Sequence, residues 1–238
     1  MKHYGLLFFL LFISSSLLWA GDVARFVNLG FSPNGSHFAF AQHGYSTDNN
    51  ETFANVFFVD VVRNVFVPGG VHSNTRPTAL QLGDNADGTL FELIERLANL
   101  RRQHNIDFNQ KGRVIYVNSS LSESLRNDLA RPANVLQFRD FESGYTFHIN
   151  LQENTFGNGA NVSSSFFIDV TATNSAGISR SHRVGLPNFV RQRVIDYAIE
   201  QIILAPGGNS LVFVVARREF SPSGSPNIRY MVETVNFR

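Results

Sequence analysis

The amino-acid sequence has no cysteine among its 238 residues. This absence excludes a disulfide framework, a thiolate metal site and a cysteine nucleophile. It also excludes a lipoprotein, because there is no cysteine to acylate. The protein must therefore be stabilised by its packed core alone.

Charge is scarce as well. Only 16% of the residues are charged, and the formal net charge is +1. A nearly neutral chain has no electrostatic attraction to nucleic acid or to anionic lipid, so we expect neither as a partner.

The usual catalytic and cofactor motifs are missing too. The sequence contains no Gly-x-Ser-x-Gly, no His-Glu-x-x-His, no Gly-x-Gly-x-x-Gly and no Walker motif. The run Asp84–Gly88 lacks the acid at the third position and the glutamate of a calcium loop, so we expect a turn and a helix start there. We name no catalytic, cofactor-binding or metal-binding residue, and we expect no cofactor.

The remaining charged clusters predict structure rather than chemistry. Asp140 and Glu142 flank Phe141 at the end of an expected strand, where we expect a solvated turn. In a neutral protein, basic clusters are better explained as ion-pair partners than as phosphate sites. These clusters are Arg180, His182 and Arg183, and the pair Arg217 and Arg218.

The first twenty residues form an export signal. Lys2 and His3 precede the apolar run Leu6–Ile13, and Ala20 ends the segment. This pattern predicts a signal peptide over residues 1–20 with cleavage after Ala20. The apolar run is shorter than the ~20 residues that span a bilayer, so we expect no membrane anchor after cleavage. The predicted location is secreted or periplasmic.

Processing makes the chain neutral. Removing residues 1–20 removes Lys2 and no acid, which leaves 19 basic residues against 19 acidic ones. The only tryptophan, Trp19, leaves with the signal peptide.

The rest of the chain is predicted to be one mainly β domain over residues 21–238. Short runs of alternating apolar and polar residues are separated by turn sequences such as Ser32-Pro33-Asn34-Gly35. Phe53–Val62 and Leu211–Ala216 are apolar on both faces, which indicates strands covered on both sides. The other expected strands cover residues 23–31, 37–42, 112–118, 134–141, 145–152, 164–173 and 178–184, and the middle block from 112 to 184 is expected to form an antiparallel meander.

Helix is expected in one main place. The segment from Thr89 has a helical apolar stripe that continues to Arg101, which predicts one amphipathic helix of about four turns packed on a sheet. Thr89 and Glu92 form a candidate capping box, and Glu92 and Arg96 a candidate i,i+4 pair. Ser122–Ala130 is a candidate for a second, shorter helix.

An internal repeat relates the two ends of the chain. A shift of 173 positions places residues 21–62 on 194–235 and aligns Pro33 with Pro206 and Gly35 with Gly208. The repeat predicts that Asp196–Leu204 is a strand, since periodicity alone leaves helix and strand open there. It also places the loops Gly44–Glu51 and Glu219–Asn227 in matching positions, and we expect the two terminal hairpins to lie close together.

These residues resemble a known family. Gly30–Phe40 resembles the hairpin of WD40-like, TolB-type β-propeller repeats, and Ala205–Phe213 resembles a degraded second copy. The whole chain resembles a bacterial family of predicted secreted proteins of unknown function. The resemblance implies export and antiparallel sheets, either propeller-like or sandwich-like, and it implies no activity.

Three functions remain open. The first is a non-catalytic periplasmic binding or scaffold module whose partner is an envelope or periplasmic protein. The second is a hydrolase that acts on envelope material with carboxylates from separate strands; raised carboxyl pKa values in a cleft would favour it. The third is an outer-membrane β-barrel, which the continuously apolar strands disfavour.

Overall fold

The computed structural model describes residues 22–78, 85–118 and 134–238, and these residues are mainly β. The strands and helices are β1 (Arg25–Phe31), β2 (His37–Ser46), β3 (Glu51–Asp60), β4 (Val65–Pro77), α1 (Asp87–Arg96), α2 (Ala98–Gln103), β5 (Arg113–Val117), β6 (Val135–Arg139), β7 (Thr146–Phe156), η1 (Gly159–Asn161), β8 (Ser163–Thr173), β9 (Ser179–Gly185), β10 (Arg191–Gln192), β11 (Val194–Leu204), β12 (Ser210–Phe220) and β13 (Pro226–Asn236).

The described strands form three antiparallel sheets. The N-terminal sheet has the order β1-β2-β3-β4, and the central sheet has the order β13-β12-β11-β5. The outer sheet contains β10-β8-β7-β6, with β9 also paired to β8. The mainly β, antiparallel class predicted from the sequence is confirmed. The predicted meander is confirmed from β6 to β9, but its first expected strand, β5, pairs with β11 in the central sheet instead.

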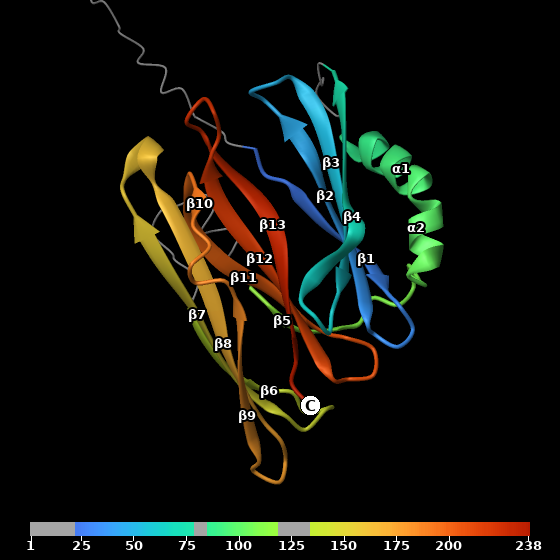
Figure 1. Ribbon diagram of the computed structural model, residues 1–238, viewed down its shortest axis with the longest axis vertical. Coiled ribbons are helices and arrows are strands. Elements are labelled where there is room, and N and C mark those ends of the chain that lie inside the picture. Colours follow the sequence, from blue (N-terminus) through green and yellow to red (C-terminus); the bar gives the residue numbers. More distant parts are fainter. Residues whose placement is uncertain (1–21, 79–84, 119–133) are drawn as a thin grey trace, which may run out of the picture.

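The sheets are stacked in layers (Figure 1). Leu211, Phe213 and Val215 of β12 pack in a cluster with the outer sheet. Val212 and Val214 of the same strand pack against the N-terminal sheet. Side chains of successive strand residues point to opposite faces, so β12 is covered on both sides. The prediction for Leu211–Ala216 is confirmed.

The helices cover the other face of the N-terminal sheet. Leu90 and Leu93 of α1 pack in one cluster with Ala54, Val56 and Phe58 of β3. Since alternate residues of β3 face the central sheet, this strand is also covered on both sides, as its sequence predicts. None of the helices in the described ranges has the length and apolar composition to cross a bilayer.

The predicted helix differs from the observed ones in two respects. It is divided at Leu97 into α1 and α2, and α1 begins at Asp87 without a side-chain cap. The predicted capping box is wrong, because the Thr89 hydroxyl contacts the Thr52 hydroxyl of β3 at 2.5 Å. Glu92 bonds to Arg76 of β4, with Arg76 Nη2 donating to Oε1 at 2.6 Å. The candidate helix Ser122–Ala130 lies outside the described residues.

Strand β4 was not predicted. It contains Pro68-Gly69-Gly70, which indicates a turn, and Gly69 has a positive φ of 65°. The strand passes through this kink by a register shift opposite Phe57 and Val59 of β3. The predicted polar loop from Gly44 is also shorter than expected, because β2 continues to Ser46.

The two terminal hairpins lie close together, as expected. The turn after β1 meets the turn after β11: a Cβ on Gly35 would lie 2.3 Å from the Pro206 carbonyl oxygen. The two hairpins belong to different sheets that face one another, which is the sandwich-like arrangement. The propeller motif is not confirmed, and the internal repeat and the domain boundaries stay predictions.

The free edge of the central sheet is closed by side chains. Gln42 Oε1 accepts a hydrogen bond from the Tyr230 backbone N–H at 2.7 Å, and Asn64 Oδ1 accepts one from Thr234 N–H at 2.8 Å. Gln42 lies on β2, and Asn64 lies in the turn between β3 and β4. Since an open edge strand is a template for pairing with another chain, these contacts protect β13.

Candidate functional site at the junction of two loops

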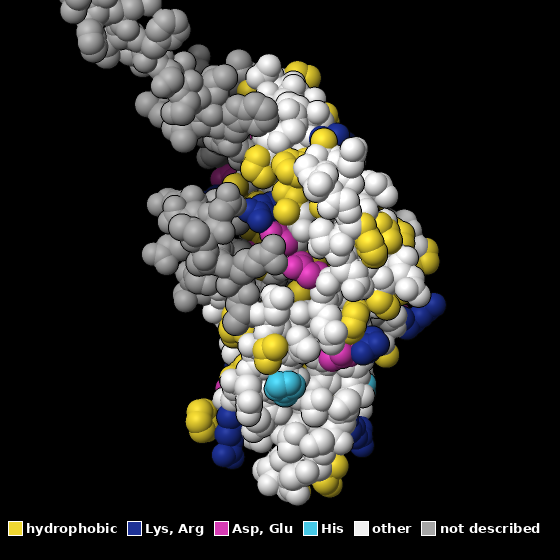
Figure 2. Space-filling view, turned by 90° about the vertical axis from the view of Figure 1, so that its left-hand side faces the viewer, with side chains coloured by type: hydrophobic (Ala, Val, Ile, Leu, Met, Phe, Trp, Pro, Cys, Tyr) yellow, Lys and Arg dark blue, Asp and Glu magenta, His cyan; other side chains and the backbone are white. Residues whose placement is uncertain are grey.

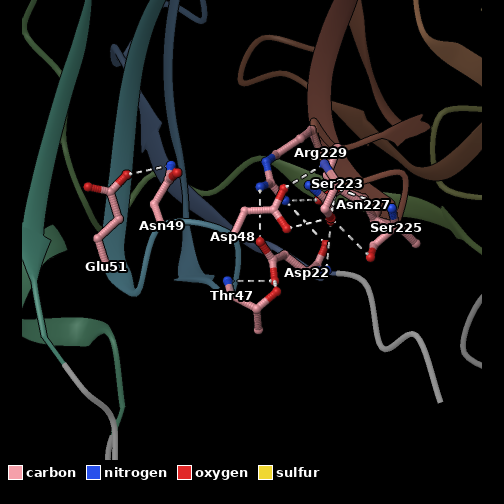
Figure 3. A network of polar contacts seen from close by, with 11 residues as sticks. Asp22, Thr47, Asp48, Asn49, Glu51, Ser223, Ser225, Asn227 and Arg229 are labelled. Atoms are coloured by element: carbon pink, nitrogen blue, oxygen red, sulfur yellow. Dashed lines mark hydrogen bonds and ion pairs between the residues drawn. The ribbon is translucent and has the colours of Figure 1, made fainter. Parts of the chain in front are cut away.

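The structure brings the two predicted loops together. We define the loop junction as the turn 47–50 between β2 and β3, the turn 221–225 between β12 and β13, and the N-terminal segment 22–24. Segment 22–24 runs beside the start of β13, where Val23 forms a parallel bridge with Ile228. Figure 3 shows Asp22, Asp48 and Ser223, one from each segment, lying close together, whereas Asn49 points to Glu51.

Asp48 joins the two turns. The Ser223 hydroxyl donates to Asp48 Oδ1 at 2.7 Å, and the Ser223 backbone N–H donates to Oδ2 at 3.4 Å. Hydrogen bonds from the hydroxyls of Ser223 and Ser221 lower the pKa of Asp48. Asp48 is therefore ionised at neutral pH and accepts these bonds as a carboxylate.

Asp22 anchors the N-terminal segment. Its Oδ1 accepts hydrogen bonds from the backbone N–H of Thr47 at 3.1 Å and from the Thr47 hydroxyl at 2.9 Å. Its own N–H donates to Asn227 Oδ1 at 2.8 Å, and its carbonyl accepts from Ile228 N–H at 2.8 Å. Because Asp22 is only 5% exposed, these bonds fix the N-terminal segment against the turn 47–50 and against the start of β13.

Arg229 lies behind Asp22. Its Nη1 donates to the Asp22 carbonyl at 3.2 Å, and its guanidinium lies 4.5 Å from the centre of the Phe53 ring. Burial lowers the pKa of Arg229, although an arginine remains charged at neutral pH. The guanidinium thus supplies a cation close to the buried Asp22 carboxylate, whose Oδ2 lies 3.9 Å from Nη2.

The junction is not arranged for nucleophilic catalysis. A serine nucleophile needs a general base within hydrogen-bond reach. Here the Ser223 hydroxyl donates to Asp48, and the Ser221 and Ser223 oxygens are 2.9 Å apart. In the described part of the chain, no histidine hydrogen-bonds to a serine of this turn.

Among the described residues, two carboxyl groups away from the junction have the raised pKa expected of acid catalysts. Burial raises the pKa of Glu200 and of Glu233. Glu200 contacts Tyr230, whereas Glu233 accepts a bond from Asn64 Nδ2 at 2.6 Å. Residues 230 and 233 of β13 point to opposite faces of the sheet, so the two carboxyl groups do not share one site.

Two clefts among the described residues have other linings. A cleft of about 470 Å³ is lined by Lys111, Arg113 and Glu142, and one of about 450 Å³ is lined by His37 and His104. Neither includes Glu200 or Glu233. Among the described residues, no group of three or more histidine, aspartate and glutamate side chains is arranged to hold a metal ion.

Comparison with known proteins gives one result. The model of a family described as predicted secreted proteins (DUF2259) matches residues 39–236, which is more than half of the 238-residue chain. The chain belongs to this family. Membership confirms the resemblance to a secreted family and the secreted or periplasmic location. A search of curated proteins finds no match.

The charged clusters of this DUF2259 protein can now be placed. Arg183 pairs with Asp169 at 2.7 Å and Arg218 with Asp196 at 2.5 Å, so they are ion-pair partners as predicted. The expectation for Asp140 was wrong. It is 7% exposed, and Arg113 donates to both of its oxygens, at 2.8 and 2.6 Å, because the turn folds back on β5.

Residues 85–88 of the DUF2259 protein start a helix, as expected for the rejected calcium loop; Asp84 lies outside the described residues. Asn85 Oδ1 accepts from the Asp87 N–H at 3.0 Å, and Asp87 Oδ1 lies 3.5 Å from Nδ1 of the buried His43.

Sequence reasoning found both loops of the junction but missed Asp22 and Arg229. Asp22 follows the predicted cleavage site by two residues, and Arg229 lies inside a strand. The repeat was the only signal that pointed to this region. The repeat aligns one loop with the other, and it gives no reason to single out a residue that lies outside both loops.

Proposed function

We propose that this DUF2259 protein is a non-catalytic binding or scaffold module of the secreted or periplasmic space, and that the loop junction is the surface it presents to an envelope protein. The hydrogen bonds between Asp48 and Ser223 carry this proposal. They connect two exposed turns that are 175 positions apart in the sequence.

Such a connection favours binding because it orders the loops in advance. A partner that docks on ordered loops does not have to restrict them, and this reduces the entropic penalty of association. Asn49, Asn50 and Pro222 are exposed at the tips, and Val23 of the N-terminal segment is 55% exposed. A polar rim next to an exposed apolar side chain is typical of protein interfaces.

The hydrolase is the second candidate. The raised pKa values of Glu200 and Glu233 favour it, because perturbed carboxyl groups gather at catalytic sites. Their positions on opposite faces of the central sheet favour a structural role instead. A hydrolase would require one of them to become accessible to substrate.

Photocrosslinking tests the proposal. A photocrosslinking amino acid is placed at Asn49, at Pro222 or, as a control, at Glu95 on the exposed side of α1, and the exported protein is irradiated in its native envelope. We expect the same crosslinked protein from both loop positions and none from Glu95. Asp48→Ala should lower the yield at the loops, because it separates the two turns.

The contrary result is equally specific. Turnover of purified envelope material by the protein, lost in Glu200→Gln or Glu233→Gln, together with no crosslink at either loop, would replace the binding function with the hydrolase.

A further inference from the structure

The edge strands of the sheets are protected in different ways. An edge strand presents unpaired N–H and C=O groups, which proteins shield with charged side chains or with a covering segment. Strand β13 is covered by the two amides described above, and β1 by the loop after α2, where the Phe31 N–H donates to the Gln110 carbonyl at 2.7 Å. Strands β5, β6 and β9 each contain at least one arginine. Figure 2 shows the side on which the outer sheet lies, with basic side chains (dark blue) at both margins of its lower part.

Strand β4 lacks such protection over one stretch. It is an edge of the N-terminal sheet, at the end of the order β1-β2-β3-β4. The kink at Pro68-Gly69-Gly70 and the following Pro77 delimit the segment Val71–Thr75, which contains no Lys, Arg, Asp or Glu. Among the described residues, no backbone group outside β3 hydrogen-bonds to the backbone of this segment. We call residues 71–75 the free edge.

The pairing register shows which groups of the free edge are unpaired. The Thr78 N–H donates to the Asn50 carbonyl at 3.0 Å, so these two residues form a hydrogen-bonded pair. Hydrogen-bonded pairs recur at every second residue of an antiparallel ladder, so the even-numbered residues of this part of β4 point their N–H and C=O groups to β3. The N–H and C=O groups of Val71, Ser73 and Thr75 therefore point away from β3, and all three residues are exposed.

We propose that the free edge pairs with the free edge of a second copy of this chain, in an antiparallel dimer with Ser73 on the two-fold axis. Ser73 then faces Ser73 of the second copy, and Val71 faces its Thr75. Each hydrogen-bonded residue pair of such a ladder forms two backbone bonds, so every unpaired group of the free edge is used. A register centred on Val71 reaches the kink, and one centred on Thr75 places Pro77, which has no N–H, opposite Ser73.

The side chains of the free edge favour a second copy. Ser73 is small and uncharged, and it meets itself on the axis without the repulsion of a like-charged pair. Val71 and Thr75 are β-branched, and such residues pair well across strands. Val71 is 54% exposed and is paired with Phe57 of β3, so the added strand would cover apolar surface of the N-terminal sheet. The dimer continues this sheet across both copies, and its pairing uses no residue of the loop junction.

A charge swap at Ser73 tests the dimer in the full mature protein. Sedimentation velocity over a wide range of concentration should show the wild type in equilibrium between monomer and dimer. Ser73→Lys and Ser73→Glu each place like charges on the axis, so each variant alone should dimerise about fivefold more weakly. An equimolar mixture of the two should recover a one-to-one dimer. Gln137→Lys, at an exposed position of the edge strand β6, is the matched control and should dimerise as the wild type does.

Ser73→Pro is a second test. It removes an N–H that points away from β3, so the ladder between β3 and β4 keeps its bonds while pairing with a second copy is blocked. We expect this variant to be monomeric at concentrations where the wild type is a dimer. Urea midpoints check that the variants are folded, and if Ser73→Pro is not, the charge swap decides.

Three results would overturn the proposal. The first is a wild type that stays monomeric at every concentration, which would leave the free edge to a strand of another protein. The second is a dimer that a folded Ser73→Pro leaves unchanged, and the third is a mixture of the charge variants that dimerises no better than either alone. Crosslinking at the loop junction depends on none of these results, so the two proposals fail separately.

Discussion

Asp140→Asn tests how the outer sheet is joined to the central sheet. Asp140 follows β6 of the outer sheet, and Arg113 begins β5 of the central sheet. Arg113 donates to both carboxylate oxygens, at 2.8 and 2.6 Å, and Ser143 N–H donates to Oδ2 at 3.2 Å. The asparagine keeps one acceptor oxygen and loses the charge, so the two-pronged contact is broken.

We expect Asp140→Asn to lower the free energy of unfolding by about 2 kcal/mol. Hydrogen bonds to charged groups contribute about 1.5–3 kcal/mol, and breaking a fully buried ion pair costs about 3–5 kcal/mol. The Arg113 side chain is 34% exposed and also pairs with Glu142 at 3.1 Å, so its charge is not left unpaired. The loss of unfolding free energy should therefore be close to that of a charged hydrogen bond and smaller than that of a fully buried ion pair.

The pH dependence gives a second test. The Arg113 guanidinium and Ser143 hold the pKa of Asp140 well below its usual value. A carboxyl whose pKa is lowered by folding stabilises the native state above its unfolded pKa of about 3.9, and this contribution is lost as the pH falls below that value. The difference in unfolding free energy between wild type and Asp140→Asn should therefore be largest at neutral pH and should decrease in acid.

Urea denaturation at pH 7, 5, 4 and 3 measures both effects. Glu142→Gln is the control, because Glu142 is 75% exposed and its pair with Arg113 should contribute less than about 0.5 kcal/mol. The reasoning would be refuted if Asp140→Asn lowered the free energy of unfolding by less than about 0.5 kcal/mol at pH 7. It would also be refuted if the loss were the same at pH 3 as at pH 7.

Three more predictions concern the layers. Phe213→Ala removes a fully buried ring of β12 and should lower the free energy of unfolding by about 3–5 kcal/mol in urea denaturation. Phe141→Ala removes a ring that is 84% exposed and should lower it by less than about 0.5 kcal/mol. Equal losses of unfolding free energy would contradict the order of the layers. Gln42→Leu leaves the Tyr230 N–H without its acceptor, so the free energy of unfolding should fall by about 1–3 kcal/mol. Because the edge of β13 is then uncovered, the variant should also self-associate further than the wild type in sedimentation. A variant that keeps the oligomeric state and the stability of the wild type would show that this edge needs no cover. Burial lowers the pKa of His43, so stability should fall as the pH drops below about 6.5, and His43→Gln should reduce this slope; a His43 imidazole that titrates normally by NMR would exclude the effect.

Local pattern was sufficient for much of the fold. Apolar residues on both faces of Phe53–Val62 and Leu211–Ala216 correctly indicated strands inside the stack, because burial on both sides removes the need for polar alternation. The turn Ser32–Gly35 was equally clear. Strand β4 was missed because Pro68-Gly69-Gly70 is typical of a turn, and only its pairing with β3 carries the strand through the kink.

Tertiary contacts decided what the pattern could not. Thr89 and Glu92 have the spacing of a capping box, yet their side chains contact Thr52 and Arg76 on the sheet below. Asp140 has the local sequence of a solvated turn, and its burial depends on Arg113, which is 27 positions away. The loop junction was predicted only as two loops in matching positions, since the bonds that join them involve residues about 175 to 205 positions apart.

The order of the layers has a consequence for how the chain is made. Three of the four strands of the central sheet come from residues 194–236, so they are synthesised after the strands of the other two sheets. Until they emerge, the N-terminal and outer sheets have no central layer on which to bury their apolar faces, and neither cluster that involves β12 can form. Because long-range sheet pairing is slow and depends on late contacts, we expect these two clusters to form after the cluster between the helices and the N-terminal sheet, which needs only residues 29–106. A chain with this order of layers can therefore be exported before the two clusters that include β12 have formed.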